Sequence, residues 1–329
     1  MSPRYDENDV EHYDRPRRHT RPRTKERPKH EDAVLARVTT IDRGRYTLLI
    51  DDRIVTAMTA RQLGRKAVVV GDCVRVVGDV SGDTGALSRI VGVEPRSTTL
   101  RRTADDDDPV ERVIVSNAEQ LVVVSSLADP PPRPRLIDRA LVAAYDSGMI
   151  PVICLTKADL GSSDELRTAY EPLDVPILVT RRGGDLTAVR DALRDRVSVL
   201  VGHSGVGKST LVNGLVPDAK RLTSSVNQVT GRGRHTSTTA ILLPLPFGGA
   251  IIDTPGIRSF GLAHVNPDQI LASFTDLAEV ATQCPRGCTH AEGAPECALD
   301  VGVADGRLDQ ARVDSMRRVL ASRERLSGD

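Results

Sequence analysis

The chain has 329 residues, with 45 basic and 45 acidic side chains and a formal net charge of zero. At about 100–200 residues per domain, this length predicts two or three domains, and 39% hydrophobic residues are typical of a globular protein. Aromatic residues make up only 2%, which argues against a protein that binds single strands by stacking on their bases.

The sequence lacks the patterns typical of membrane and secreted proteins. No apolar run approaches the ~18 residues of a membrane span, and the N-terminus lacks the apolar core of a secretory signal peptide. Five cysteines are too few for a disulfide scaffold in a chain of this length. We therefore expect a cytoplasmic protein with reduced thiols and no membrane partner.

Residues 1–33 are expected to form a disordered basic arm. Between Arg15 and His30, Arg and Lys recur with Glu26 as the single acid, and prolines interrupt the run. Such a stretch cannot bury apolar surface. It is either a solubilising tail or an electrostatic contact to a phosphate backbone, and the sequence leaves both open.

Residues 34–100 alternate short β-rich runs with turn signals. The runs are VLARVTTI, RYTLLI, RIVTAM, AVVVGDCVRVVGDV and ALSRIVGV, separated by turns that contain Gly or Asp. Short strands at this spacing predict a small closed barrel of the OB or SH3 type. The acidic stretch Asp105–Asp108 is expected to mark the boundary of the next domain.

Residues 108–263 alternate apolar strands with helical patterns. The apolar runs are QLVVVSSLA, IPVICLT, VPILVT, VSVLVG, ILLPL and GAIIDT. This alternation predicts an α/β domain in which a parallel sheet is covered on both faces. Residues 264–329 read as mostly helical and are expected to form a third domain.

A phosphate-binding loop follows the strand VSVLV. The segment fits G-x-x-x-x-G-K-S/T between a strand and a helical pattern, which is the context that such a loop requires. Its glycines let backbone N–H groups approach phosphates, Lys208 would reach the β- and γ-phosphates, and the Ser209 hydroxyl would bind Mg²⁺. The predicted nucleotide-binding residues are Gly202, His203, Ser204, Gly205, Val206, Gly207, Lys208, Ser209 and Thr210.

A second motif points to the base. Thr156, Lys157, Ala158 and Asp159 follow the strand IPVICL and resemble the N/T-K-x-D motif of GTPases, whose carboxylate accepts hydrogen bonds from guanine and whose lysine stem packs on the ring. Adenine lacks those donors, so a buried carboxylate would reject it. The motif predicts GTP and GDP as ligands. If the match were accidental, the alternative would be an ATP-dependent enzyme.

A third motif, D-x-x-G, follows the strand GAIIDT. Asp253 would hold Mg²⁺ through water, and the Gly256 N–H would contact the γ-phosphate. The hydroxyl-rich segment 231–239 suits a first switch, in which Thr238 or Thr239 completes the Mg²⁺ shell.

The order of these motifs is unusual, because the base-reading motif precedes the phosphate loop. No lysine follows Lys220, so no later segment supplies a second such motif. Domain termini often lie close together, so the same sheet can be made by a chain cut and rejoined elsewhere. We interpret the domain as a circularly permuted GTPase, in which the second switch connects directly to the C-terminal region. A partner that holds the flanking domains could therefore sense or drive the switches.

The group that orients the attacking water is not obvious from the motifs. Many GTPases place glutamine directly after D-x-x-G, but Ile257 stands here and cannot form a side-chain hydrogen bond. His235 in the first-switch segment is our candidate catalytic residue; the alternative is an ordinary solvated loop histidine. We expect slow intrinsic turnover that a partner accelerates.

A cluster of cysteine and histidine lies in the C-terminal region. Cys284, Cys288, His290 and Cys297 match a structural Cys₃His zinc site, which is tetrahedral and leaves no open position for catalysis. A last helix is expected from about Asp305 to Arg325, and its arginines suit phosphate contacts.

Together these features resemble the ribosome-small-subunit-dependent GTPase A family over residues 34–326. The motifs that carry the resemblance are TKAD, GHSGVGKST, GRHTSTT, DTPGIRSFGL, CPRGCTH…C and VADGRLDQARVDSM, in that order. The resemblance implies an OB barrel at residues 34–100, a permuted GTPase domain at 108–263 and a zinc-binding helical domain at 264–329. It also implies a monomer that binds the small ribosomal subunit and its rRNA, and that acts in late maturation of that subunit with GTP hydrolysis stimulated by it.

The sequence departs from the family pattern at several positions. Thr156 replaces the usual Asn, which should weaken base contacts slightly, and Ser237 replaces the middle threonine of GRHTTT. The zinc spacing C-x₃-C-x-H-x₆-C replaces C-x₄-C-x-H-x₅-C, so the ligand set is expected to survive with altered loops. No role is assigned to Thr180-Arg181, which replaces Ser-Ala. A competing hypothesis remains open: a nucleic-acid binding module whose nucleotide switches affinity with negligible turnover.

Overall fold

The computed structural model describes residues 30–63, 68–103, 111–217, 240–254, 260, 262 and 265–322. Every element below belongs to the unit Ala33–Asp329. The expectations for residues 1–29, for Asp105–Asp108, for the first-switch segment with His235 and Thr238, and for Gly256 and Ile257 lie outside the described residues. In the described part, no helix combines the length and apolar character needed to cross a bilayer.

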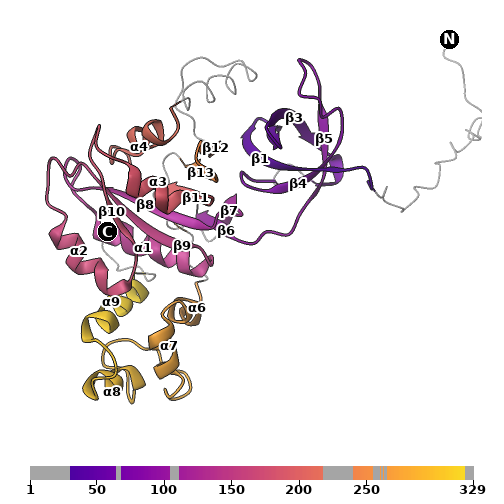
Figure 1. Cartoon of the computed structure of the whole chain (residues 1–329). Helices are drawn as coiled ribbons and strands as arrows, with labels where there is room; N and C mark the ends of the chain where they lie inside the picture. Colours follow the sequence, from indigo (N-terminus) through magenta and orange to yellow (C-terminus); the bar gives the residue numbers. More distant parts are fainter. Residues whose placement is uncertain are drawn as a thin grey trace, which may run out of the picture. The chain divides into compact units, whose positions relative to one another are not determined.

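The first strands close into a barrel (Figure 1). Around it run β1 (Val34–Asp42), β2 (Arg45–Ile50), β3 (Arg53–Thr59), β5 (Ser88–Val93) and β4 (Cys73–Gly78), which pairs back onto β1; a 3₁₀ turn, η2 (Arg61–Leu63), follows β3. Alternate side chains point inward, and the core includes Val38, Leu48, Val55, Val74 and Ile90. Strands β3 and β5 are parallel while the other neighbours are antiparallel. Of the two barrel types that the sequence left open, this order is OB-like.

A buried carboxylate ties the barrel to the strand pair that follows it. This antiparallel pair, β6 (Thr99–Thr103) and β7 (Glu111–Ser116), was not anticipated from the sequence. Asp72 is fully buried and accepts hydrogen bonds from the Arg96 guanidinium at 2.7 and 2.8 Å and from the Ser116 hydroxyl at 2.6 Å. The backbones also meet: a Cβ atom on Gly71, whose φ is +92°, would lie 2.0 Å from the Ser116 carbonyl oxygen. Only glycine fits there.

The next strands form a six-stranded sheet in the order β10-β9-β8-β11-β13-β12. They are β8 (Gln120–Ser126), β9 (Ile150–Thr156), β10 (Ile177–Val179), β11 (Val197–Val201), β12 (Ile241–Pro244) and β13 (Ala250–Asp253). Each apolar run predicted as a strand is present. Neighbours are parallel except β12, which runs antiparallel to β13, so the expectation of a wholly parallel sheet was wrong at this edge. The connection of residues 245–249 is too short for the crossover that a parallel pair requires.

Helices cover both faces of this sheet, as predicted. They are α1 (Pro134–Asp146), α2 (Asp164–Tyr170), α3 (Thr187–Leu193) and α4 (Lys208–Leu215), with a 3₁₀ turn, η3 (Glu171–Leu173), after α2. Side chains alternate along β8: Leu121 and Val123 share a core with α1, whereas Val122 and Val124 share one with α3 and α4. Burial on both faces explains why the strand reads as a continuous apolar run.

The C-terminal region is helical and contains α6 (Pro267–Ala272), α7 (Thr275–Ala281), α8 (Ala298–Ala304) and α9 (Gln310–Ala321) (Figure 1). The last helix begins later than the expected Asp305. Gly306, with a φ of +72°, ends α8, and the Asp309 side chain caps α9 by accepting the Arg312 N–H at 3.1 Å. Val313 and Met316 of α9 share a buried core with α1, so this helix packs on the sheet domain.

The arginines of α9 were expected to suit phosphate contacts, but those in the described residues bond to protein acceptors. Arg312 donates to both Asp276 oxygens, at 2.7 and 2.9 Å. Arg318 pairs with the buried Asp138 of α1 at 3.4 Å and lies over the Tyr170 ring. Those beyond residue 322 lie outside the described part. The described arginines therefore hold α9 in place, and their contact with phosphates stays a prediction.

Candidate nucleotide site and metal centre

The phosphate loop connects β11 to α4. Gly202, Gly205 and Gly207 have positive φ angles, and a Cβ atom on Gly202 would lie 2.3 Å from the Val124 carbonyl oxygen. These glycines keep the backbone in a conformation that other residues rarely adopt. Helix α4 begins at Lys208, so its N-terminal N–H groups face the loop, where an anion is favoured.

A half-buried lysine at the start of α4 lies near a half-buried carboxylate at the end of β13. The Lys208 ammonium donates to the Gly202 carbonyl at 3.3 Å and to the Thr254 carbonyl at 3.1 Å. Burial lowers the pKa of Lys208, and the charge of Asp253 opposes this shift. Burial raises the pKa of Asp253, and Lys208 opposes that shift in turn. Both charged groups are therefore partly removed from water at the place where the phosphates would bind.

One oxygen of Asp253 has no hydrogen-bond partner in the described part of the chain. Its Oδ1 atom is buried and accepts no hydrogen bond from the described residues. Burying a carboxylate oxygen without a partner is costly unless a cation or its water satisfies it. Ser209 in the first turn of α4 is exposed and adds a hydroxyl. The carboxylate and hydroxyl oxygens of these two residues are of the kind that Mg²⁺ prefers as ligands.

The base-reading segment begins where β9 ends. The Thr156 hydroxyl donates to the Val206 carbonyl of the phosphate loop at 2.5 Å. Lys157 has a φ of +58°, and its ammonium donates to the Asp129 carbonyl. The Asp159 side chain is exposed, so it is accessible to a guanine base. The two motifs, which lie far apart in sequence, therefore meet at one edge of the sheet.

The loop after β8 also lies at this site, although none of the sequence motifs indicates it. The Ser126 hydroxyl donates to the Pro130 carbonyl at 2.7 Å, and the Leu127 N–H donates to the Thr156 carbonyl at 3.0 Å. Pro130 lies against the phosphate loop, where a Cβ atom on Gly205 would be 3.4 Å from its Cδ atom. The available signal was the run DPPP directly after an apolar strand, next to the predicted base-reading strand.

Two further residues hold these loops. His203 Nδ1 lies 3.0 Å from the Ser204 carbonyl oxygen, so Nδ1 carries the proton, and its buried Nε2 atom has no partner among the described residues. Thr180, to which no role had been assigned, accepts the Ala158 N–H on its carbonyl at 3.1 Å. The strand end of β10 thus supports the base-reading segment from the other side.

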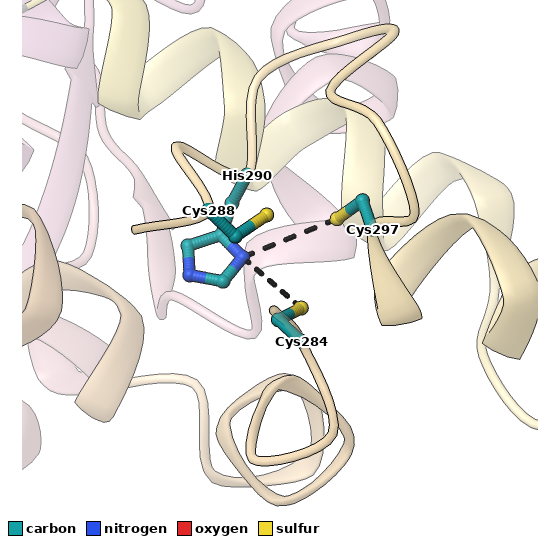
Figure 2. Close-up of side chains that lie close together, drawn as sticks. All are labelled: Cys284, Cys288, His290 and Cys297. Carbon is teal, nitrogen blue, oxygen red and sulfur yellow. Dashed lines mark hydrogen bonds between the residues drawn. The ribbon is translucent and has the colours of Figure 1, made fainter. Parts of the chain in front are cut away.

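The four predicted metal ligands converge between α7 and α8 (Figure 2). One ligand atom each from Cys284, Cys288, His290 and Cys297 lies within 4.8 Å of the others. His290 Nδ1 lies 3.6 Å from Cys284 Sγ and 4.0 Å from Cys297 Sγ. Three sulfurs and one imidazole at these separations fit a tetrahedral zinc site.

Burial affects the protonation of the cluster. It raises the pKa of the Cys284 thiol to about 11, so a metal that bound there would displace its proton. Burial lowers the pKa of His290, which favours the neutral imidazole that binds metal. The Ala298 N–H also donates to Cys284 Sγ at 3.2 Å. This donor set fits zinc better than a hard cation.

Comparison with known proteins gives concordant matches. The family model described as RsgA GTPase matches residues 93–263. The small ribosomal subunit biogenesis GTPase RsgA of Pseudomonas syringae pv. syringae is 40% identical over 265 residues, covering 78% of this chain and 75% of that protein. The protein of the same name from Alcanivorax borkumensis is 38% identical over 277 residues, covering 80% and 76%.

Solved structures agree in fold. YjeQ from Thermotoga maritima superposes with a TM-score of 0.62 at 25% identity, covering 88% of this chain and 97% of that one. YloQ, described as a circularly permuted GTPase, gives a TM-score of 0.63 at 24% identity, covering 90% and 96%. The order of motifs along this chain and the order of strands in its sheet agree with that description.

Proposed function

Because the chain belongs to the RsgA GTPase family, we propose that it hydrolyses GTP on the small ribosomal subunit during late maturation of that subunit. The observation that carries this proposal is the meeting of the base-reading and phosphate loops at Thr156 and Val206, beside the half-buried pair Lys208 and Asp253. A site with both loops can bind a guanine nucleotide. We also infer that the protein acts as a monomer in the cytoplasm.

Each motif residue has a role in this proposal. Asp159 would accept hydrogen bonds from guanine while the Lys157 stem covers its ring, which discriminates against adenine. Lys208 would neutralise charge on the β- and γ-phosphates, together with N–H groups at the start of α4. Asp253 and Ser209 would hold Mg²⁺, which when bound neutralises charge on the phosphate oxygens. Gly256 and Thr238 would complete the γ-phosphate and Mg²⁺ contacts.

The attacking water needs a polar group that Ile257 cannot supply. His235 is our candidate, because it lies in the hydroxyl-rich first-switch segment and can donate or accept a hydrogen bond. The small subunit would bring this segment into position, so turnover without it would be slow. A binding module that hardly turns over GTP is the competing outcome.

The C-terminal cluster would hold one structural zinc ion through Cys284, Cys288, His290 and Cys297. All positions around the ion are then filled by protein, so zinc stabilises the loop between α7 and α8 and takes no part in hydrolysis. The basic arm and the barrel would add contacts to rRNA phosphates.

Binding to purified small subunits tests whether nucleotide and partner are coupled. Cosedimentation should be tighter with a non-hydrolysable GTP analogue than with GDP, because only the triphosphate orders both switches. Equal affinity in both nucleotide states would contradict the switch part of the proposal.

A further inference from the structure

One arginine of α9 reaches the Cys/His cluster rather than the sheet domain. The Arg317 Nε atom donates to the His290 carbonyl at 2.9 Å, and its Nη2 atom donates to Cys297 Sγ at 3.8 Å. Its Nη1 atom pairs with Asp300 of α8 at 2.8 Å. A single planar guanidinium thus contacts two of the four candidate ligands and the helix that follows them. Its side chain is only 10% exposed.

The net charge of a zinc-bound cluster explains why a positive side chain would be favourable at this position. Three thiolates and one neutral imidazole around Zn²⁺ leave one negative charge in excess, in a partly buried loop. Arg317 brings a positive charge directly to the Cys297 sulfur, and a charge-assisted hydrogen bond to sulfur lowers the cost of burying that thiolate. Asp300, which is 46% exposed, balances the far side of the guanidinium from a more solvated position.

The same contact connects the cluster to the sheet domain. On α9, the neighbouring Arg318 pairs with Asp138 of α1 and donates to the Ala169 carbonyl at 2.8 Å. Adjacent residues of one short helix therefore hold the metal loop and the GTPase helices. Movement of α9 away from α1 would pull Arg317 from the sulfur, and loss of the metal charge would weaken the anchor of α9.

We propose that Arg317 positions and neutralises the His290–Cys297 half of the zinc site, and so links zinc occupancy to the docking of α9. This inference rests on the proposed zinc site. Partners that hydrogen-bond to metal ligands change metal affinity by roughly 10- to 100-fold when removed, which gives the expected scale. An arginine suits the task better than a lysine because its planar fork can reach sulfur and carbonyl oxygen together.

Zinc affinity of the full chain, measured by competition with a chromophoric chelator, tests the proposal. Arg317→Met keeps the length of the side chain but removes its charge and donors, and we expect zinc binding to weaken by roughly 10- to 100-fold. The zinc affinity of Arg317→Lys should lie between those of the wild type and Arg317→Met, because lysine keeps the positive charge but not the planar guanidinium. The matched control is Arg307→Met, which removes an exposed arginine that pairs with Asp305 at 3.3 Å and should leave zinc affinity unchanged.

A spectroscopic readout separates this role from general destabilisation. In the cobalt-substituted protein, loss of the hydrogen bond to Cys297 sulfur should shift the thiolate-to-metal charge-transfer band to longer wavelength in Arg317→Met. Wild-type zinc affinity together with an unshifted band in that variant would overturn the proposal for Arg317. A wild-type chain that binds no zinc would instead overturn the zinc site itself.

Discussion

The Thr156 hydroxyl donates a hydrogen bond of 2.5 Å to the carbonyl oxygen of Val206, although the two residues lie 50 positions apart in the sequence. This bond joins the end of β9 to the phosphate loop. The Thr156 side chain therefore acts on the phosphate loop whether or not it touches the base. Although Thr156 stands where the family usually has Asn, its hydroxyl still provides a hydrogen-bond donor to the phosphate loop.

Replacing Thr156 with Val should weaken GTP and GDP binding together. Valine has the same shape but no donor, so the Val206 carbonyl loses its partner, at a cost of about 0.5–1.5 kcal/mol. That corresponds to roughly 2- to 10-fold in each dissociation constant. Titration with a fluorescent nucleotide measures it. Thr156→Asn, which restores an amide donor, is the control and should bind at least as tightly as the wild type; a Val variant indistinguishable from wild type would refute this role.

Asp159→Asn should change the base that the site prefers. An amide has one acceptor oxygen where the carboxylate has two, so it cannot accept from both guanine N–H groups, while its own N–H can donate to the 2-oxo group of xanthine. GTP affinity should therefore drop by at least about 100-fold while XTP affinity rises. Competition of GTP, XTP and ATP for one labelled nucleotide measures both effects. Unchanged preference for GTP would mean that TKAD does not read the base.

Asp72→Ala should destabilise the protein by about 3–5 kcal/mol, because it leaves Arg96 and the Ser116 hydroxyl without the acceptor they share. Thermal or urea unfolding gives the free energy. The control is Arg75→Ala in the same barrel, whose pair with Glu94 is 50% and 36% exposed and should contribute less than about 1 kcal/mol. An equal loss in the free energy of unfolding in both variants would show that the buried contacts of Asp72 contribute no more than the exposed pair.

Arg318→Leu should destabilise the chain in a way that depends on pH. Burial raises the pKa of Asp138 and Arg318 opposes the shift, so removing Arg318 should raise that pKa further. A carboxyl with a raised folded-state pKa keeps its stability contribution below its unfolded pKa and loses it as pH rises through the folded value. The loss should therefore be larger at neutral pH than near pH 4, and about 1–2 kcal/mol because Arg318 is 38% exposed. Unfolding curves at both pH values test this, and a loss that is equal at both would contradict it.

Sequence patterns predicted those parts of the fold that rest on local chemistry. Every apolar run of the sheet became a strand, and the reversed order of TKAD and the phosphate loop predicted the permutation. Patterns of apolar residues carry no direction, so the antiparallel β12 was missed. Long-range polar contacts were missed for a related reason: nothing near Asp72 in the sequence indicates Ser116 as its partner, and nothing near Arg317 indicates Cys297.

The candidate site divides in the same way. Glycine spacing and the lysine and aspartate motifs predicted one loop for phosphate and one for the base, and the structure brings these loops together. The ligands they bind stay a prediction. The loop at Asp129–Pro130 was not predicted, because its role depends on where the end of β8 lies relative to the phosphate loop. The protein acceptors of the α9 arginines were not predicted, because a sequence shows charge but not the groups that fold against it.

The most direct test of the central claim is the rate of GTP hydrolysis measured with purified small ribosomal subunits, with large subunits and with neither. We predict slow hydrolysis alone and with large subunits, and a clear acceleration by small subunits that His235→Ala removes while nucleotide binding is kept. A wild-type rate that small subunits leave unchanged would contradict the account.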